Sequence, residues 1–298
     1  MQSKSVFSRR AEYPYQVKSL ANLPDGLRQL AEQAIPAAEP TNTIFVIPEQ
    51  MMPKKLGGLG GKHRVPEQAL LFTPHGVIHV QAGESADEMG QAKYLPGNSL
   101  LYVRVSLVLL YGQMELFVAV NDSLTRIVVQ YNSVSHELML PALKNFLRLA
   151  WDQTRDQESN GYQNLLLGKL EEQSYKFRSG LTNHCLQPDE SLLGFVFQPR
   201  ILKRYLHMFN RLIEPASLLA LTDKQLITIE EGSTSATSYG YFFTFCPKAN
   251  VVNIETKTNA RLQDVYIHLR KDNVTADHQL TLENANALAS QALWAKYA

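Results

Sequence analysis

The sequence predicts an α+β chain, mainly β, built from two tandem antiparallel β-barrels that are each capped by a C-terminal helix. Three observations predict this fold. The 298 residues suffice for two domains of about 100–200 residues each. One pattern of apolar runs and polar turns occurs twice, about 150 residues apart. After each occurrence come further alternating runs typical of strands, and then a segment with helical spacing.

The composition indicates a globular chain without a strong overall charge. Hydrophobic residues make up 45% and charged residues 19% of the sequence, which argues against disorder. The 29 Lys and Arg residues nearly balance the 28 Asp and Glu residues, leaving a net charge of +1. Because no global field attracts nucleic acid or an anionic membrane, any electrostatic function must come from a local patch.

Cysteine content and the apolar stretches indicate a cytoplasmic chain. Cys185 and Cys246 stand alone, with no C-x-x-C pair for zinc or redox chemistry, so we expect two buried thiols in a reducing compartment. The first residues lack the apolar run of a signal peptide. The longest apolar stretch, Ser99–Gly112, is interrupted by Arg104 and is too short for the roughly 20 residues of a membrane helix. We expect it to form a strand.

The repeat is clearest between Gln68–Glu84 and Ser217–Ser233. Pro66 aligns with Pro215 at an offset of 149, and Thr73 then falls on Thr222 without a gap. In each copy an apolar run meets a four-residue polar turn, and a second apolar run follows. Two such runs around a short turn predict a β-hairpin.

The similarity extends outward with small shifts. Ile44–Pro48 resembles Gly194–Pro199 at offset 150, and Asp122 falls over Asp272 at the polar tips of two later pairs of alternating runs. Further strands are expected between the hairpins, at Leu100–Leu110, Tyr239–Phe245 and Val251–Lys257. The aromatic run in Tyr239–Phe245 could offer a base-stacking platform, but it has no nearby Lys or Arg before Lys248 and favours strand core.

Each copy ends in a segment with helical spacing of apolar residues. The first is His136–Trp151, where Pro141 predicts a kink or the true first turn, and the second is Asn284–Tyr297. An amphipathic helix can cover the open end of a curled antiparallel sheet. A third helical segment, Tyr162–Phe177, lies in the polar bridge between the copies.

The hairpin "LLALTDKQLITIEE" at Leu218–Glu231, together with the terminal helix, resembles the bacterial pleckstrin-homology-like (PH-like) domains. Copy one departs from this pattern at Pro74–Gly76 in its turn. The resemblance implies two partly open β-barrels capped by helices, and it implies no catalytic residue and no cofactor. It places the first domain at residues 41–151, a helical bridge and linker at 152–190, and the second domain at 191–298.

One segment combines basic and apolar residues with a helical period. Gln198–Pro215 predicts a basic amphipathic helix bounded by Pro199 and Pro215. Its charged arc is either a solvated face or a site for an anionic ligand. The candidate residues are Arg200, Lys203, Arg204, His207 and Arg211.

The corresponding part of copy one, Pro53–Pro66, is a basic, glycine-rich loop. It fails as a phosphate-binding loop of the G-x-x-x-x-G-K-[ST] type, because Leu56 replaces the first Gly and His63 replaces Ser/Thr. A flexible loop, or contact with a phosphate or lipid headgroup, remains open. The candidate residues are Lys54, Lys55, Lys62 and Arg64.

Motifs for metal and catalytic chemistry are missing from the sequence. His75 and His79 have a helical metal spacing but flank a predicted strand, so we expect surface or hairpin residues. His136-Glu137 begins the H-E-x-x-H motif, yet Leu140 stands where the second His is needed. No G-x-S-x-G sequence is present. We therefore predict no metal site and no catalytic residue.

The sequence thus favours a non-catalytic binding or scaffolding module that recognises a protein, a peptide or an anionic lipid surface, and not nucleic acid. One alternative is a structural protein that forms homo-oligomers through the Gln198–Pro215 segment. Another is an enzyme without a recognisable motif, which a pocket of convergent titratable groups with shifted pKa values would favour.

Overall fold

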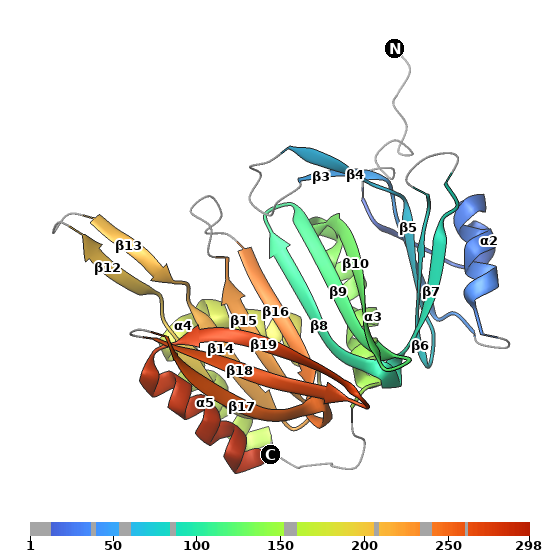
Figure 1. Cartoon of the computed structure of the whole chain (residues 1–298). Helices are drawn as coiled ribbons and strands as arrows, with labels where there is room; N and C mark the ends of the chain where they lie inside the picture. Colours follow the sequence, from blue (N-terminus) through green and yellow to red (C-terminus); the bar gives the residue numbers. More distant parts are fainter. Residues whose placement is uncertain are drawn as a thin grey trace. The chain divides into compact units, whose positions relative to one another are not determined.

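The computed structural model describes residues 13–36, 40–53, 61–83, 88–151, 160–205, 209–232, 240–259 and 262–298. Figure 1 shows an α+β molecule in which the strands are mostly antiparallel. The chain divides into two compact units. The first contains Met1–Leu100, Ser106–Val118 and Arg126–Ala150, and the second contains Leu101–Val105, Ala119–Thr125 and Trp151–Ala298.

The same order of elements occurs twice along the chain. The first series is β2 (Thr43–Ile47), β3 (Gln50–Pro53), β4 (Lys62–Val65), β5 (Gln68–Phe72), β6 (Gly76–Gln81), β7 (Gln91–Pro96), β8 (Leu100–Val108), β9 (Tyr111–Val120), β10 (Ser123–Asn132) and α3 (His136–Arg148). The second series is β11 (Leu192–Gln198), β12 (Ile201–Tyr205), β13 (Phe209–Glu214), β14 (Ser217–Thr222), β15 (Gln225–Glu231), β16 (Gly240–Pro247), β17 (Val251–Asn259), β18 (Leu262–Lys271), β19 (Val274–Leu282) and α5 (Asn284–Tyr297). The predicted duplication of strands followed by one helix is therefore present in the order of elements.

The strands also pair in the same order. In the first series β2, β5, β6 and β7 are successive neighbours, and in the second series β11, β14, β15 and β16 are. The last three strands of each series, β8–β10 and β17–β19, are likewise paired in sequence order. In the described residues none of these sheets closes on itself, so the predicted β-barrels are not confirmed.

The two central hairpins share their turn chemistry down to single atoms. In β5–β6 the backbone N–H groups of His75 and Gly76 donate to the hydroxyl of Thr73, 3.3 and 2.9 Å away. In β14–β15 the N–H groups of Lys224 and Gln225 donate to Thr222 at 3.2 and 2.8 Å. A Thr hydroxyl that accepts local N–H groups stabilises a turn that ordinary residues can adopt. The predicted hairpins are confirmed.

The strand register corrects the sequence alignment of the outer strands. Phe45 pairs with Leu70, whereas Val196 pairs with Leu219. Because Leu70 and Leu219 are equivalent at offset 149, Phe45 is equivalent to Val196, at offset 151 and not 150. The turns of the β9–β10 and β18–β19 hairpins give the same offset. Asn121 and Asp272 are the first residues of these turns, both adopt positive φ, and they are 151 residues apart.

The prediction of a helix over Gln198–Pro215 is wrong, because this segment is the hairpin β12–β13. Lys203 pairs with Arg211, and Leu202 pairs with Leu212 after a bulge near Ile201. Charged and apolar residues lie within the segment at spacings compatible with both periods. The segment is a hairpin and not a helix because its two short β-rich runs pair with each other. This hairpin occupies the same place in the second series as β3–β4 in the first.

The sequence interpretation missed two N-terminal elements of the first unit. Strand β1 (Tyr15–Val17) pairs antiparallel with β2, and helix α2 (Asp25–Ala34) contacts β6 and β7 (Figure 1). Helix α2 buries Leu27 and Ala31 in a core that it shares with strands β2, β5 and β6. Leu27, Leu30, Ala31 and Ala34 follow helical spacing, so the signal for α2 was present in the sequence.

The remaining predicted elements are observed. Helix α5 has the predicted bounds, α3 contains Pro141 in its interior, and the predicted bridge helix is α4 (Asn160–Gly180), which is kinked at Ser174. Both cysteines are free and buried. No helix in the described part of the chain combines the length and the apolar character needed to cross a membrane.

Candidate functional site

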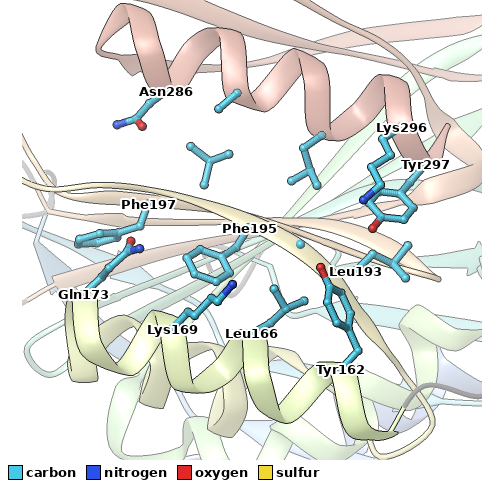
Figure 2. A pocket seen from close by; sticks show the side chains of 14 residues that line it. Tyr162, Leu166, Lys169, Gln173, Leu193, Phe195, Phe197, Asn286, Lys296 and Tyr297 are labelled. Atoms are coloured by element: carbon cyan, nitrogen blue, oxygen red, sulfur yellow. The ribbon is translucent and has the colours of Figure 1, made fainter.

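A groove opens in the second unit along strand β11, which is the last strand of its sheet in the described residues. Figure 2 shows the strand between helix α4 on one side and helix α5 on the other. The groove has a volume of about 400 Å³, within the range of ligand sites in proteins. Its lining residues are Tyr162, Leu166, Lys169, Gln173, Leu193, Gly194, Phe195, Val196, Phe197, Asn286, Ala289, Leu293, Lys296 and Tyr297.

Helix α4 forms one wall because aromatic residues fix it against β11. The rings of Phe177 and Phe197 meet edge to face with their centroids 5.1 Å apart, and Phe177 is buried. Successive strand residues point to opposite faces, so Phe195 lies on the same face as Phe197. Both Phe195 and Phe197 are only half-buried, which leaves apolar surface facing the groove.

Helix α5 forms the other wall, and a buried glutamine joins it to the end of β11. The side-chain oxygen of Gln198 accepts hydrogen bonds from the backbone N–H of Glu283 at 2.9 Å and from Asn286 at 2.8 Å. Further along the strand, a Cβ at Gly194 would lie 2.5 Å from Leu293. The absence of a side chain at Gly194 therefore lets the helix approach the strand.

The charge in the groove is entirely basic. Lys169 on α4 and Lys296 on α5 are exposed at its two walls, and none of the lining residues is acidic. The other polar groups of the lining are tyrosine hydroxyls and amides, which can donate and accept hydrogen bonds. An apolar floor with two cations suits a ligand that carries both apolar groups and a carboxylate or another anion.

Among the predicted anion-binding residues, Arg200 is engaged inside its own unit. Its Nε lies 2.5 Å from a carboxylate oxygen of Glu231, and the Nζ of Lys176 lies 2.9 Å from the other oxygen. Burial raises the pKa of Glu231, but hydrogen bonds from Arg200 and Lys176 outweigh it, so this pKa is lowered overall. Arg200 therefore neutralises a nearly buried carboxylate.

Lys203 and Arg211 lie directly opposite each other on the β12–β13 hairpin, and both are exposed. Two like charges at facing positions of an antiparallel pair repel each other, so this arrangement costs stability without an anion nearby. The next pair, Leu202 and Leu212, is also exposed, and it points to the opposite face of the hairpin. The hairpin therefore carries basic groups on one face and apolar groups on the other. The side chain of Arg204 and the whole of His207 lie outside the described residues.

In copy one the basic candidates are divided. Lys54 and Lys55 lie outside the described residues. Lys62 is exposed on β4, whereas Arg64 on the same strand makes a 2.6 Å ion pair with Glu49. Among the candidates whose side chains the structure describes, Lys203 and Arg211 lie opposite each other, whereas Arg64 and Arg200 are each held by a carboxylate.

A second polar cluster lies inside the second unit and was not expected from the sequence. The imidazole Nε2 of His278 lies 2.9 Å from the hydroxyl of Thr228 and 3.9 Å from the carboxylate of Glu230. Burial raises the pKa of Glu230 to about 7, against a lowering effect of Arg104, and burial lowers the pKa of His278 to about 3.

This cluster pairs a hydroxyl with an imidazole but is not arranged for nucleophilic catalysis. Thr228 has no exposed surface, so a substrate cannot reach its hydroxyl. A histidine whose pKa is about 3 is also a weak base near neutral pH. The cluster is better explained as buried polar groups, because burial favours the uncharged forms of both Glu230 and His278.

The structure also locates the two histidines that have a metal-like spacing in the sequence, His75 and His79. His75 is exposed in the β5–β6 turn, as expected, and His79 is a hairpin residue on β6, as the expectation allowed. His79 is buried, and its Nε2 lies 3.0 Å from the side-chain oxygen of Gln68. Burial lowers the pKa of His79 to about 4. No group of His, Cys, Asp and Glu in the described part of the chain has the arrangement of a metal site.

No protein-family model and no curated protein matches this chain. The groove along β11 and the β12–β13 hairpin are therefore the features from which a function can be inferred. Sequence analysis missed the groove because its walls come from two segments more than a hundred residues apart, Tyr162–Gln173 and Asn286–Tyr297. Burial alternates along Leu192–Gln198, whereas in the equivalent strand β2 the residues 44–47 are all buried.

Proposed function

We propose that this protein is a non-catalytic binding module whose ligand is a protein segment held in the groove between α4 and α5. The proposal includes two PH-like units at residues 41–151 and 191–298 with a bridge at 152–190, in the cytoplasm. The repeated order of strands with a terminal helix supports the PH-like part. The free, buried Cys185 and Cys246 agree with a reducing compartment.

The observation that carries the proposal is the composition of the groove. About 400 Å³ of space is lined by the half-buried Phe195 and Phe197 and by two lysines, with no acidic residue and no exposed nucleophile–base pair in the lining. Such a site can hold apolar and anionic groups but has no group placed to activate a substrate. A polypeptide carries both kinds of group on one chain.

Panning of a random peptide library against the full-length protein tests this proposal. We expect peptides whose affinity falls at least tenfold for Phe195→Asp, because the substitution places a charge on the apolar floor. Leu165→Asp is the matched control, since Leu165 is exposed on α4 and does not line the groove. Peptides that bind both variants equally well would contradict a role for the groove.

A second candidate function is contact with an anionic lipid surface through the β12–β13 hairpin. It is favoured by Lys203 and Arg211, which face each other and are exposed on one face of the hairpin, while Leu202 and Leu212 are exposed on the other face. Each basic residue held near an anionic bilayer contributes about 1 kcal/mol of attraction, so two give only weak, reversible binding.

Vesicle sedimentation tests the lipid candidate. Lys203→Glu/Arg211→Glu should pellet less than wild type with phosphatidylserine vesicles, and neither protein should pellet with neutral vesicles. Lys18→Glu/Lys271→Glu has the same net charge and lacks changes in the hairpin, so it should behave as wild type. Equal pelleting of all three proteins with phosphatidylserine would rule out the hairpin as a lipid contact.

A further inference from the structure

The first copy already contains an added strand at the position where the second copy has its groove. Strand β1 pairs antiparallel with β2, so that Tyr15 faces Val46, Gln16 faces Phe45 and Val17 faces Ile44. Only three residues form this strand, and it comes from a segment outside the repeated series of elements. The outer edge of the first repeated strand can therefore accept a short antiparallel segment.

The strand register shows which residues of the second copy are equivalent to the residues of β2 that pair with β1. Through their partners on β5 and β14, Ile44–Val46 are equivalent to Phe195–Phe197 of β11. All three residues of Phe195–Phe197 line the groove. The surface that β1 covers in copy one is thus the surface that lies open in copy two.

The open edge of β11 offers backbone hydrogen-bonding groups. In an antiparallel ladder alternate residues direct their N–H and C=O groups to the partner strand, and the others point away from it. β11 has β14 on one side and no neighbouring strand on the other in the described residues. An edge of this kind is a template for another strand unless something blocks it, and here the helices flank it without filling the groove.

We propose that an extended segment of a partner protein adds to β11 as an antiparallel strand opposite Phe195–Phe197. This inference rests on the proposed function of the groove and specifies how the ligand binds. Backbone hydrogen bonds to β11 would fix the direction of the segment, and its alternate side chains would contact α4 and α5 in turn. The mode requires an extended backbone with free N–H groups.

The groove also indicates the chemistry of that segment. The face of β11 that carries Phe195 and Phe197 accepts aromatic or β-branched side chains, as β1 supplies in Tyr15 and Val17. Lys169 and Lys296 at the walls favour a carboxylate at one or both flanks of the strand. Strand β1 is already paired with β2, so it is not free to pair with β11 of the same chain, and we assign this role to a partner protein.

The experiment begins with peptides selected by panning a random decapeptide library on the full-length protein. Each selected peptide is synthesised unmodified and with a methyl group on one backbone nitrogen at a time, and its affinity is measured by fluorescence polarisation. Strand addition predicts that methylation at alternate positions weakens binding at least tenfold, whereas methylation at the positions between has little effect. Lys169→Glu should also weaken the binding of acidic peptides.

The outcomes separate this inference from the function on which it rests. Peptides that depend on Phe195 but tolerate methylation at every position would overturn strand addition and leave the binding groove intact. Selection of no peptide that depends on Phe195 would overturn both. Light scattering of the free protein supplies the remaining test, because a dimer that Phe195→Asp dissociates would mean that a second copy, not a partner segment, occupies the edge.

Discussion

Equivalent residues in the two copies can have the same role, and the threonines in the turns of the two central hairpins are an example. Thr73 and Thr222 accept the same local N–H groups, and the Thr222 hydroxyl also lies 2.6 Å from the carboxyl group of the buried Glu190. The Thr222 hydroxyl also lies 2.9 Å from the carbonyl of Gln225. A hydroxyl has one proton to donate. The oxygen of this hydroxyl already accepts from the N–H groups of Lys224 and Gln225, so its one proton is shared between the Glu190 carboxyl oxygen and the Gln225 carbonyl.

The pKa of Glu190 leads to a pH prediction. Burial raises this pKa to about 7, although hydrogen bonds from Thr222, Gln225 and Gln187 lower it in part. A carboxyl group with a raised pKa in the folded state stabilises the fold below its unfolded pKa, and this contribution is lost as pH rises toward 7. A rise from 4.5 to about 7 corresponds to on the order of 3 kcal/mol.

We therefore expect Glu190→Gln to gain stability relative to wild type as the pH increases from 5 to 8, because glutamine cannot ionise. Urea unfolding at both pH values measures this difference. Glu172→Gln, at an exposed position of α4, is the control and should show no such trend. A constant difference between Glu190→Gln and wild type over this range would show that Glu190 is already ionised at pH 5.

At the scale of elements, local patterns predicted most strands and the terminal helices. Asn284–Tyr297 is helical because nothing competes with its spacing, and Leu218–Glu231 forms a hairpin because a Thr-centred turn separates two apolar runs. Gln198–Pro215 was misread because its charges and apolar residues fit both a helix and two short strands. Comparison with the short basic segment at the same place in copy one would have favoured a hairpin.

The candidate site was beyond prediction for a different reason. Its residues belong to a strand and two helices that are distant in sequence, and a groove exists only where their packing leaves space. The pattern of charges predicted Arg200 as an anion-binding residue, but in the folded chain Arg200 neutralises Glu231. Local charge patterns identify cations but not the carboxylates that meet them after folding.

At the scale of the whole molecule, the repeat accounts for both similarity and specialisation. The two copies share strand order, turn chemistry and a closing helix, yet one has its first strand covered by β1 and the other has a groove there. In a chain with two such copies, one strand edge is paired with β1 and the equivalent edge is unpaired in the described residues. The unpaired edge can bind a ligand without a change of fold.

The difference between the two edges can be measured directly in the free protein. Backbone N–H groups of β2 that face β1 are hydrogen-bonded, so the segment 43–47 should exchange its amide hydrogens more slowly than the segment 193–197. Gln16→Pro removes a backbone donor from β1 and should release that strand. Exchange of the segment 43–47 should then accelerate, while exchange of 193–197 stays unchanged.

The control for this comparison is Gln16→Ala, which keeps the backbone N–H and should leave both segments as in wild type. Hydrogen exchange followed by mass spectrometry has the resolution for such short segments. Equal protection of 43–47 and 193–197 in wild type would mean that the β11 edge is already occupied, and the groove would then have no free strand edge to offer to a partner.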